Sequence, residues 1–474
     1  MKNLINGQWR EGKETAPNIN PFTGKVIDQS ALASPKDVED AAVAAVNAFE
    51  HTRKRPAWKR AEVLARGAEI MKRRKEELVE TMTAEFGRPR MFNDIETERG
   101  IFTLINAAEE AKRLNGEYIP LDLMPATENR YAYYRYEPIG PVFGISPFNF
   151  PINLLMHKIC PSLAAGCTLS VKIPPQTPNT PRIVAEIMME AGCIDGELNV
   201  FDCTPQVAEA GVRDDRYKLL TFTGSPKVGW YLKSIAGKKP VILELGNSSA
   251  AIVHHDVRDL DWCVNRLVVG SFAAAGQVCI STQRIFIHEK IYGEFEKRFV
   301  EAVKKMPWGD PSNPKAIMGP VVDDLGANRI ESWIKEATDG GAKVLSGGKR
   351  KERLIDPTVL TNVKPTMKVA CEEVFGPVVS LWKYTDKDNV FAMSNATPFG
   401  LQTAVFTDSI AFMDKAVDEC EVAGVMINEY PTFRIDHMPY GGIKDSGLGR
   451  EGVKYSLHDY TEKKLVVVNK KPTA

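Results

Sequence analysis

Short apolar runs alternate with longer helical stretches from residue 141 onward, and this alternation limits the possible folds more than any other feature of the sequence. The first runs cover residues 142–146, 168–171, 198–201, 218–222 and 241–245. They are apolar throughout rather than at every second position, which is typical of parallel strands buried on both faces and linked by helices. Ligands bind beyond the carboxyl ends of strands in such sheets, so residues at these ends are the first candidates for a functional site.

A second series of runs follows residue 279, at residues 284–288, 343–345, 378–382, 403–406 and 425–427. A chain of 474 residues exceeds what one hydrophobic core usually supports, so we expect a second α/β domain. Nearer the N-terminus, capping residues at 34–37 predict an amphipathic helix, and apolar spacing predicts one helix from about 61 to 86. Residues 131–136 and 464–468 form β-rich segments outside both series, and a partner subunit is one way to cover exposed strands of this kind.

Charge and cysteine content exclude several classes of protein. Basic and acidic residues both number 61, so no global field favours nucleic acid or an anionic membrane. The eight cysteines form no Cys-x-x-Cys pair, which favours reduced thiols and argues against structural zinc. No apolar run has the length of a signal peptide or a membrane span. We expect a soluble, cytoplasmic protein that has no metal and binds neither nucleic acid nor membrane.

Three residues at strand ends or beside small residues could carry chemistry. Cys279 ends the stretch Gly-Gln-Val-Cys at 276–279, directly after the run of mostly small residues at 271–275, and a cysteine thiolate is a strong nucleophile. Glu244 closes an apolar strand, where loss of solvent would raise its pKa and let it activate a thiol or a water. Asn149, between two prolines, could donate its amide to an oxyanion. The plain alternatives are a buried thiol, an exposed carboxylate and a turn-forming asparagine.

Two further features could bind a cofactor. The segment from Gly224 to Gly229 follows a strand and opens a helix, so its backbone N–H groups could hold a pyrophosphate. It departs from Gly-x-Gly-x-x-Gly and is a weak signal by itself. Lys172, at the end of another strand, could meet ribose hydroxyls or be a surface lysine. No motif ties any of the seven histidines to Cys279; structural or solvent roles are expected for His254, His255 and His437.

The order and spacing of these motifs resemble those of the NAD(P)-dependent aldehyde dehydrogenase superfamily over essentially the whole chain. The series comprises Pro-Phe-Asn-Phe-Pro at 147–151, Val171-Lys172, Phe-Thr-Gly-Ser at 222–225, Glu-Leu-Gly at 244–246, Gly-Gln-Val-Cys at 276–279, Glu-Glu-Val-Phe-Gly-Pro at 372–377, and Pro-Tyr-Gly-Gly at 439–442 followed by Gly-Arg-Glu at 449–451. The resemblance implies an α/β fold with a Rossmann-type dinucleotide-binding domain (1–118 and 138–246), an α/β catalytic domain (247–450) and small oligomerisation strands (119–137 and 459–474). It also implies a homodimer or a homotetramer.

The resemblance further implies a role for each matching residue. Cys279 would be the nucleophile, Glu244 the base for the deacylating water, and Asn149 with the Cys279 N–H the oxyanion site. Lys158 and Glu451 would relay protons to Glu244. The cofactor-binding set would be Ile145, Ser146, Pro147, Phe148, Lys172, Pro174, Pro175, Gly224, Ser225, Gly229, Leu245, Gly246, Glu373 and Phe375. The expected reaction is oxidation of an aldehyde to the carboxylic acid through a thiohemiacetal and a thioester.

Three departures from the family pattern affect these expectations. Asn247 stands where many members have glycine, which alters the turn behind the base. Pro175 stands where NAD-using members often have a glutamate for the ribose 2′-hydroxyl, so we expect NADP to serve at least as well as NAD. Val278, before the nucleophile, supplies no cation for a phosphorylated substrate.

The substrate is the least constrained feature. Arg434 and His437 lie in the segment before Pro-Tyr-Gly-Gly that borders the aldehyde tunnel in the family, which suggests a small hydroxylated or anionic aldehyde. The plain alternative is that Arg434 only pairs with a carboxylate. Other functions left open are a CoA-acylating dehydrogenase, a non-catalytic protein on the same fold and a cofactor-independent cysteine hydrolase.

Overall fold

The first of two large sheets contains the strands predicted before residue 246. The computed structural model describes residues 1–471, so the end of the predicted oligomerisation segment, residues 472–474, lies outside the described residues. The strand order is β2-β1-β9-β8-β7-β10-β11-β23, and the five central strands are parallel. The bounds are β1 Asn3–Ile5, β2 Gln8–Arg10, β7 Val142–Ile145, β8 Leu169–Lys172, β9 Leu198–Phe201, β10 Leu219–Thr223, β11 Val241–Glu244 and β23 Gly447–Leu448. β1 and β23 pair antiparallel to their neighbours.

Helices cover both faces of this sheet, as the continuous apolar runs predict. Val142 packs on one face with α2 (Ala57–Arg73), α4 (Arg90–Glu110), α5 (Asn153–Ala165) and α6 (Asn179–Ala191). The next residue, Phe143, packs on the other face with α1 (Pro35–Thr52), α7 (Pro205–Arg213) and α8 (Pro226–Ile235). Successive strand residues therefore enter two separate cores, which confirms a parallel sheet buried on both sides.

The N-terminal helices confirm one prediction and correct another. Ser34 and Asp37 form a reciprocal capping box at the start of α1. The single helix expected over residues 61–86 is wrong, because α2 ends at Arg73 and α3 (Lys75–Phe86) begins after a break at Arg74, whose φ is −95° and ψ 15°. The Arg74 side chain bonds to Glu77 and Glu186 at this break. The break lets α2 and α3 each pack an apolar face against α4.

The second large sheet contains the strands predicted after residue 279, and it is parallel except at β14. Its order is β14-β17-β18-β13-β12-β20-β21, with bounds β14 Lys343–Ser346, β17 Thr358–Thr361, β18 Val378–Tyr384, β13 Thr282–His288, β12 Ser249–Val253, β20 Gln402–Phe406 and β21 Gly424–Ile427. One face packs against α9 (Leu260–Phe272), α10 (Glu289–Lys305) and α11 (Asp324–Asp339), and the other against α13 (Val390–Asn395) and α14 (Ile410–Glu419). The predicted α/β class is confirmed.

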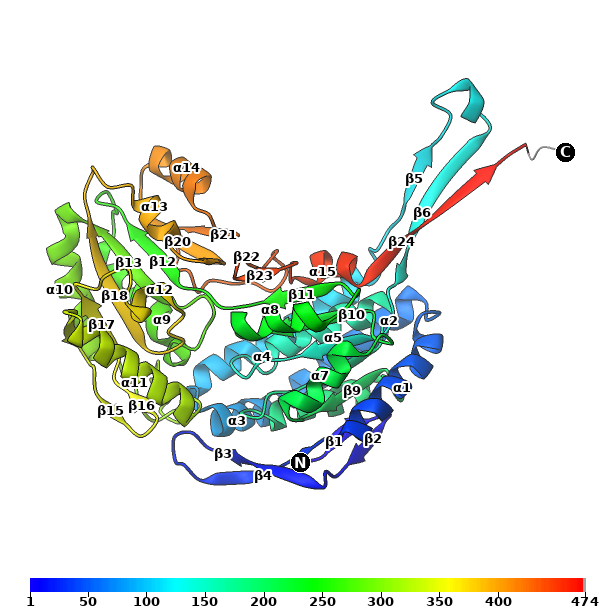
Figure 1. Ribbon diagram of the computed structural model, residues 1–474, viewed down its shortest axis with the longest axis horizontal. Helices are drawn as coiled ribbons and strands as arrows, with labels where there is room; N and C mark the ends of the chain where they lie inside the picture. The colour runs from blue at the N-terminus through cyan, green and yellow to red at the C-terminus, as the bar shows by residue number, and fades with distance from the viewer. Residues whose placement is uncertain (472–474) are drawn as a thin grey trace.

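A third, three-stranded sheet projects away from both large sheets (Figure 1). It has the order β24-β6-β5, with β24 Thr461–Asn469, β6 Arg130–Pro138 and β5 Glu117–Pro120, and it joins the two β-rich segments set apart in the sequence. Smaller elements complete the fold: β3 Glu14–Ile19, β4 Val26–Leu32, β15 Arg350–Lys351, β16 Leu354–Ile355, β19 Phe399–Gly400, β22 Ile443–Lys444, α12 Lys368–Cys371, α15 Val453–Asp459 and the 3₁₀ turns η1 Pro125–Thr127 and η2 Ala273–Gly276. Among residues 1–471, no helix is both long enough and apolar enough to cross a membrane.

Candidate active site

A cavity of about 350 Å³ lies at the carboxyl ends of β7, β8, β10 and β11. Cys279, Glu244 and Asn149 all line it, together with most of the residues expected to bind a cofactor: Ser146, Pro147, Phe148, Lys172, Pro174, Pro175, Gly224, Ser225, Leu245, Gly246, Glu373 and Phe375. Strand ends that are distant in the sequence therefore meet at one cavity, as expected for parallel strands.

Six candidate residues do not line this cavity. Ile145 is the last residue of β7, and Gly229 packs against the Leu245 side chain behind the wall. Lys158 and Glu451 are buried near Glu244, and their charges shift its pKa. Arg434 lies on the Tyr440 ring, and His437 is exposed against Phe102.

Strained backbone precedes the Cys279 thiol. Ala274 and Ala275 have φ values of 53° and 54°, in a region that is costly for residues other than glycine. Gly276 follows with φ 68°, and any side chain there would collide with the carbonyl oxygen of Gly376. Such strain persists only where the surrounding structure enforces it, and it commonly marks functional loops.

The thiol itself is largely buried. The Sγ of Cys279 lies 2.8 Å from the Tyr440 hydroxyl oxygen. Burial raises the pKa of Cys279 to about 12, although the Tyr440 contact and the nearby Arg434 lower it. The thiol is therefore protonated at neutral pH in this state, and its reaction requires a proton acceptor. Tyr440 belongs to the Pro-Tyr-Gly-Gly motif, but sequence reasoning assigned it no role.

Asn149 is held between the Cys279 loop and a buried ion pair. Its side-chain Nδ2 donates to the Gln277 carbonyl over 3.0 Å, which places the amide beside the Cys279 loop. The backbone carbonyl oxygen of Asn149 accepts a hydrogen bond from the Arg88 guanidinium over 3.1 Å. Arg88 pairs with Glu96, and both side chains are 1% exposed.

Glu96 also holds the far side of the Asn149 loop. One of its carboxylate oxygens accepts the backbone N–H groups of Ile152 and Asn153, over 2.9 and 3.0 Å. The Arg88–Glu96 pair thus fixes the loop on both sides of Asn149. No local pattern in the sequence links Arg88 to residue 149, so this contact could not be predicted.

Glu244 has an unusual electrostatic environment. It is 4% exposed, and among the described residues neither carboxylate oxygen has a hydrogen-bond partner. Burial raises the pKa of Glu244 well above its ordinary value, and the Glu451 carboxylate raises it further. A buried, unpartnered carboxylate is costly and is a mark of a functional base.

The group behind Glu244 contains both signs of charge. The Lys158 ammonium lies 3.9 Å from one Glu451 oxygen and donates to the Thr223 hydroxyl over 2.7 Å. Burial lowers the pKa of Lys158. For Glu451, burial is outweighed by His157, Arg434 and Lys158, so its pKa falls below the ordinary value. The two charges therefore act on the pKa of Glu244 in opposite directions, since Glu451 raises it and Lys158 lowers it.

The other part of the cavity offers groups that suit a dinucleotide. Lys172 pairs with Asp202 over 3.3 Å at the ends of β8 and β9. The hydroxyl of Ser146 is buried without a partner among the described residues. Helix α8 begins at this cavity and lacks a side-chain cap, which leaves backbone N–H groups for a phosphate. An ammonium, a free hydroxyl and a helix N-terminus fit the hydroxyls and phosphates of a nucleotide.

Glu373 and Phe375 reach the cavity from the second sheet. Glu373 accepts the backbone N–H of Asn247 over 3.0 Å, and burial raises the pKa of Glu373 to about 7. Phe375 has a φ of 46° and packs edge-on against Phe148, with ring centroids 5.9 Å apart. Asn247, a departure from the family pattern, thus joins the turn after Glu244 to Glu373. Arg329 also lines the cavity and was missed in the sequence.

The contacts of Arg434 favour the plain alternative for this residue. Its guanidinium donates to Glu451 over 2.9 Å, lies 3.5 Å from Asp436 and sits 3.7 Å from the Tyr440 ring centroid. Asp436 in turn accepts from Arg99 and lies 3.1 Å from His157. Although burial opposes it, contact with His157 and Arg99 holds the pKa of Asp436 well below its ordinary value. Arg434 is thus already paired inside the protein.

Comparisons with known proteins agree with this geometry. The chain matches the family model described as "Aldehyde dehydrogenase family" over residues 9–466. It is 41% identical to a 3-sulfolactaldehyde dehydrogenase of Priestia aryabhattai over 468 residues, covering 98% of this chain and 97% of the relative.

Solved structures show the same fold. The crystal structure of aldehyde dehydrogenase 21 from Physcomitrella patens with the reaction product succinate has a TM-score of 0.97, 38% identity, and coverage of 100% of this chain and 99% of that one. A glyceraldehyde-3-phosphate dehydrogenase from Methanocaldococcus jannaschii, complexed with NADP, has a TM-score of 0.93, 34% identity, and coverage of 97% and 100%. Since the family model spans nearly the whole chain and these relatives align from end to end, the chain belongs to the aldehyde dehydrogenase family.

Proposed function

We propose that the chain oxidises an aldehyde to a carboxylic acid with a nicotinamide dinucleotide, through a covalent intermediate on Cys279. The observation that carries the proposal is the buried, unpartnered carboxylate of Glu244 in the same cavity as Cys279 and Asn149. A cavity that holds a nucleophile, a base and an amide donor has the groups that acyl transfer requires.

Each group has one task in this proposal. The Cys279 thiol gives its proton to water in the cavity as its sulfur attacks the aldehyde carbon, and the Asn149 amide with the Cys279 N–H stabilises the resulting oxyanion. A nicotinamide dinucleotide bound in the cavity would accept the hydride whose loss turns the thiohemiacetal into a thioester. Glu244 then takes a proton from the water that hydrolyses the thioester, and Lys158 and Glu451 pass that proton on.

The proposed cofactor is NADP at least as readily as NAD. The family includes structures with NAD⁺ and with NADP, so the choice depends on local groups. Pro175 lines the cavity three residues after Lys172 and brings no carboxylate to repel a 2′-phosphate. Asp202, paired with Lys172, is the competing carboxylate that would instead favour NAD. We assign residues 1–118 and 138–246 to cofactor binding and residues 247–450 to catalysis.

The proposed substrate is a small hydroxylated or anionic aldehyde. The names of relatives support this class: one is a 3-sulfolactaldehyde dehydrogenase, and the Physcomitrella enzyme carries succinate as its product. Arg434 lies on Tyr440, which contacts Cys279, but it is already paired with Glu451. Arg434 therefore contributes its positive charge to the site, but its guanidinium is not free to bind a substrate.

A CoA-acylating enzyme would hand its thioester to a thiol and would not need Glu244 as a base for water.

The test is a panel of aldehydes crossed with NAD and NADP, followed by absorbance of the reduced nicotinamide. Cys279→Ala should lose oxidation and keep cofactor binding, because only the covalent step is removed. Cys371→Ala is the matched control, since Cys371 is a half-buried thiol outside the cavity. Wild-type-like turnover by Cys279→Ala would contradict the covalent mechanism.

We also propose that the three-stranded sheet joins subunits into a homodimer or a homotetramer. Leu465 and Val467 on β24 are 59% and 53% exposed, and Tyr118 on β5 is 62% exposed. Exposed apolar side chains on a projecting sheet are typical of a surface that a second copy covers.

We propose a cytoplasmic location as well, because all eight cysteines are unpaired, which suits a reducing compartment.

A further inference from the structure

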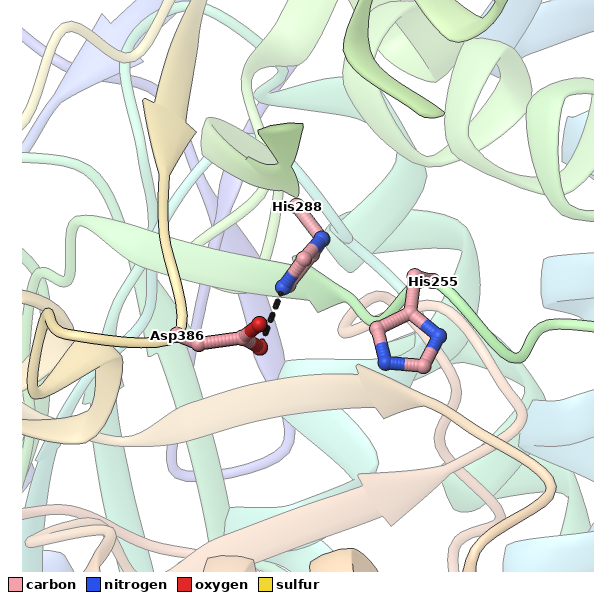
Figure 2. A group of neighbouring side chains, drawn as sticks. All are labelled: His255, His288 and Asp386. Atoms are coloured by element: carbon pink, nitrogen blue, oxygen red, sulfur yellow. Dashed lines mark hydrogen bonds and ion pairs between the residues drawn. The ribbon is translucent and has the colours of Figure 1, made fainter. Parts of the chain in front are cut away.

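Two histidines and an aspartate meet at the carboxyl edge of the second sheet (Figure 2). His255 follows β12, His288 is the last residue of β13, and Asp386 follows β18. These three parallel strands are neighbours in the sheet, so their ends bring together residues that are far apart in the sequence. None of the three lines the Cys279 cavity.

The three side chains offer a suitable set of donors for a transition metal ion. One atom from each lies within 4.8 Å of the other two, and His288 Nε2 is 2.8 Å from an Asp386 carboxylate oxygen. Two imidazoles and one carboxylate, with the remaining positions open to water, are ligands that suit Zn²⁺, Co²⁺ and similar ions.

The two imidazoles differ in their burial and in their contacts with neighbouring residues. His288 is fully buried and therefore fixed, whereas Asp386 is 63% exposed and gives solvent access to the group. His255 is half-buried and packs against the His254 ring, with centroids 4.2 Å apart. His254 is itself held by Asp256 over 2.8 Å, so it supports the His255 ring.

Lys290 is the main competitor for this site. Its ammonium lies 3.3 Å from the second Asp386 oxygen, but the side chain is 54% exposed and can turn to solvent. Its backbone N–H donates to His288 Nδ1 over 3.2 Å at the start of α10, so His288 Nε2 carries the proton that it shares with Asp386. When a metal binds Nε2, the neutral ring carries its proton on Nδ1, which can then no longer accept the Lys290 N–H. Loss of this helix-cap bond costs about tenfold in affinity. Three new metal–ligand bonds outweigh the loss of one cap.

We propose that His255, His288 and Asp386 bind a divalent transition metal ion at a site separate from the catalytic cavity. The site lies on the strand ends of the second sheet, so metal binding is expected to stabilise that sheet without taking part in aldehyde oxidation.

The test is titration of the full chain, first treated with a chelator, with Co²⁺ and then displacement by Zn²⁺. The wild type should show visible d–d bands with one equivalent bound at this site. Thiolate ligation would add intense charge-transfer bands, which separate this site from Cys279 and Cys371. His255→Ala and Asp386→Asn should each weaken Co²⁺ binding at least about tenfold, because each removes a ligand. Both residues are accessible to solvent, so these variants should fold.

Two controls complete the test. His51→Ala removes an exposed histidine from α1 and should leave binding unchanged. Lys290→Met removes the competing ammonium and should tighten binding. The proposal is overturned if the wild type binds no Co²⁺, if only thiolate bands appear, or if His255→Ala and Asp386→Asn bind as tightly as the wild type.

Discussion

The ion pair of Arg88 and Glu96 provides a sharp test of how the fold positions Asn149. Glu96→Gln retains the shape of the side chain but leaves the Arg88 charge unpaired in a site where both residues are 1% exposed. Leaving one member of a buried pair alone typically costs about 3–5 kcal/mol of the free energy of unfolding. The guanidinium also lies over the Phe86 and Phe150 rings, 5.2 and 5.0 Å from their centroids. This cation–π contact offsets part of the loss, so we expect about 3 kcal/mol.

The same variant should slow catalysis. Arg88 donates to the Asn149 backbone carbonyl, so a shift of the Arg88 side chain should move the Asn149 amide that we propose as the oxyanion donor. Removal of an oxyanion donor costs about 10²- to 10³-fold in kcat, and we expect displacement to cost about 10- to 100-fold. The assays are denaturant unfolding, steady-state kinetics and calorimetric cofactor binding. Cofactor affinity should stay within about twofold, because the pair does not line the cavity.

Two variants separate positioning from stability. Arg88→Met combined with Glu96→Gln removes both charges and keeps an oxygen for the Ile152 and Asn153 N–H groups, so it should recover part of the stability, while kcat stays low because the Asn149 carbonyl lacks its donor. Glu190→Gln breaks the exposed pair with Arg73 and should cost less than about 1 kcal/mol with kcat unchanged. If Glu96→Gln loses stability but keeps the wild-type kcat, the pair does not position Asn149, and the reasoning is refuted.

Three other predictions concern the cofactor, the base and assembly. Pro175→Glu should shift the ratio of kcat/KM for NADP and NAD toward NAD by about 1–3 kcal/mol. If this ratio is unchanged in Pro175→Glu but changes in Asp202→Asn, Asp202 sets the cofactor preference. Because the pKa of Glu244 is raised and only its ionised form accepts a proton, steady-state turnover should fall as pH falls through that pKa, and a flat pH–rate profile would argue against this base. Deleting the residues after Lys464 removes most of β24 and should give monomers or aggregate by light scattering, whereas a fully active monomer would contradict the assembly.

The ends of the strands are the part of the fold that the sequence predicts best. Residues 198–201 were predicted as a strand and form β9 with the same bounds, because a short apolar run between helices has few alternatives. Parallel strands share one carboxyl edge, so the positions of Asn149, Lys172 and Glu244 at one cavity also followed from the pattern.

Contacts between distant segments could not be predicted in this way. The apolar spacing continues through Arg74, so the break between α2 and α3 leaves no local signal. Arg88 and the Asn149 carbonyl are 61 residues apart, and nothing near either residue indicates the other. The pairing of Arg434 with Glu451 was foreseen only as the plain alternative, since the partner depends on how the C-terminal segments pack.

The central claim is that Glu244 activates the water that releases a thioester from Cys279, and pre-steady-state kinetics of Glu244→Gln tests it most directly. An amide cannot take a proton from water, so acylation should remain fast while deacylation becomes rate-limiting. Rapid mixing of this variant with aldehyde and NADP should give a burst of reduced cofactor close to one equivalent per active site, followed by a depressed steady rate. Mass spectrometry of the quenched protein should find the acyl group on Cys279. Loss of the burst together with the steady rate, or a steady rate equal to that of the wild type, would contradict the account.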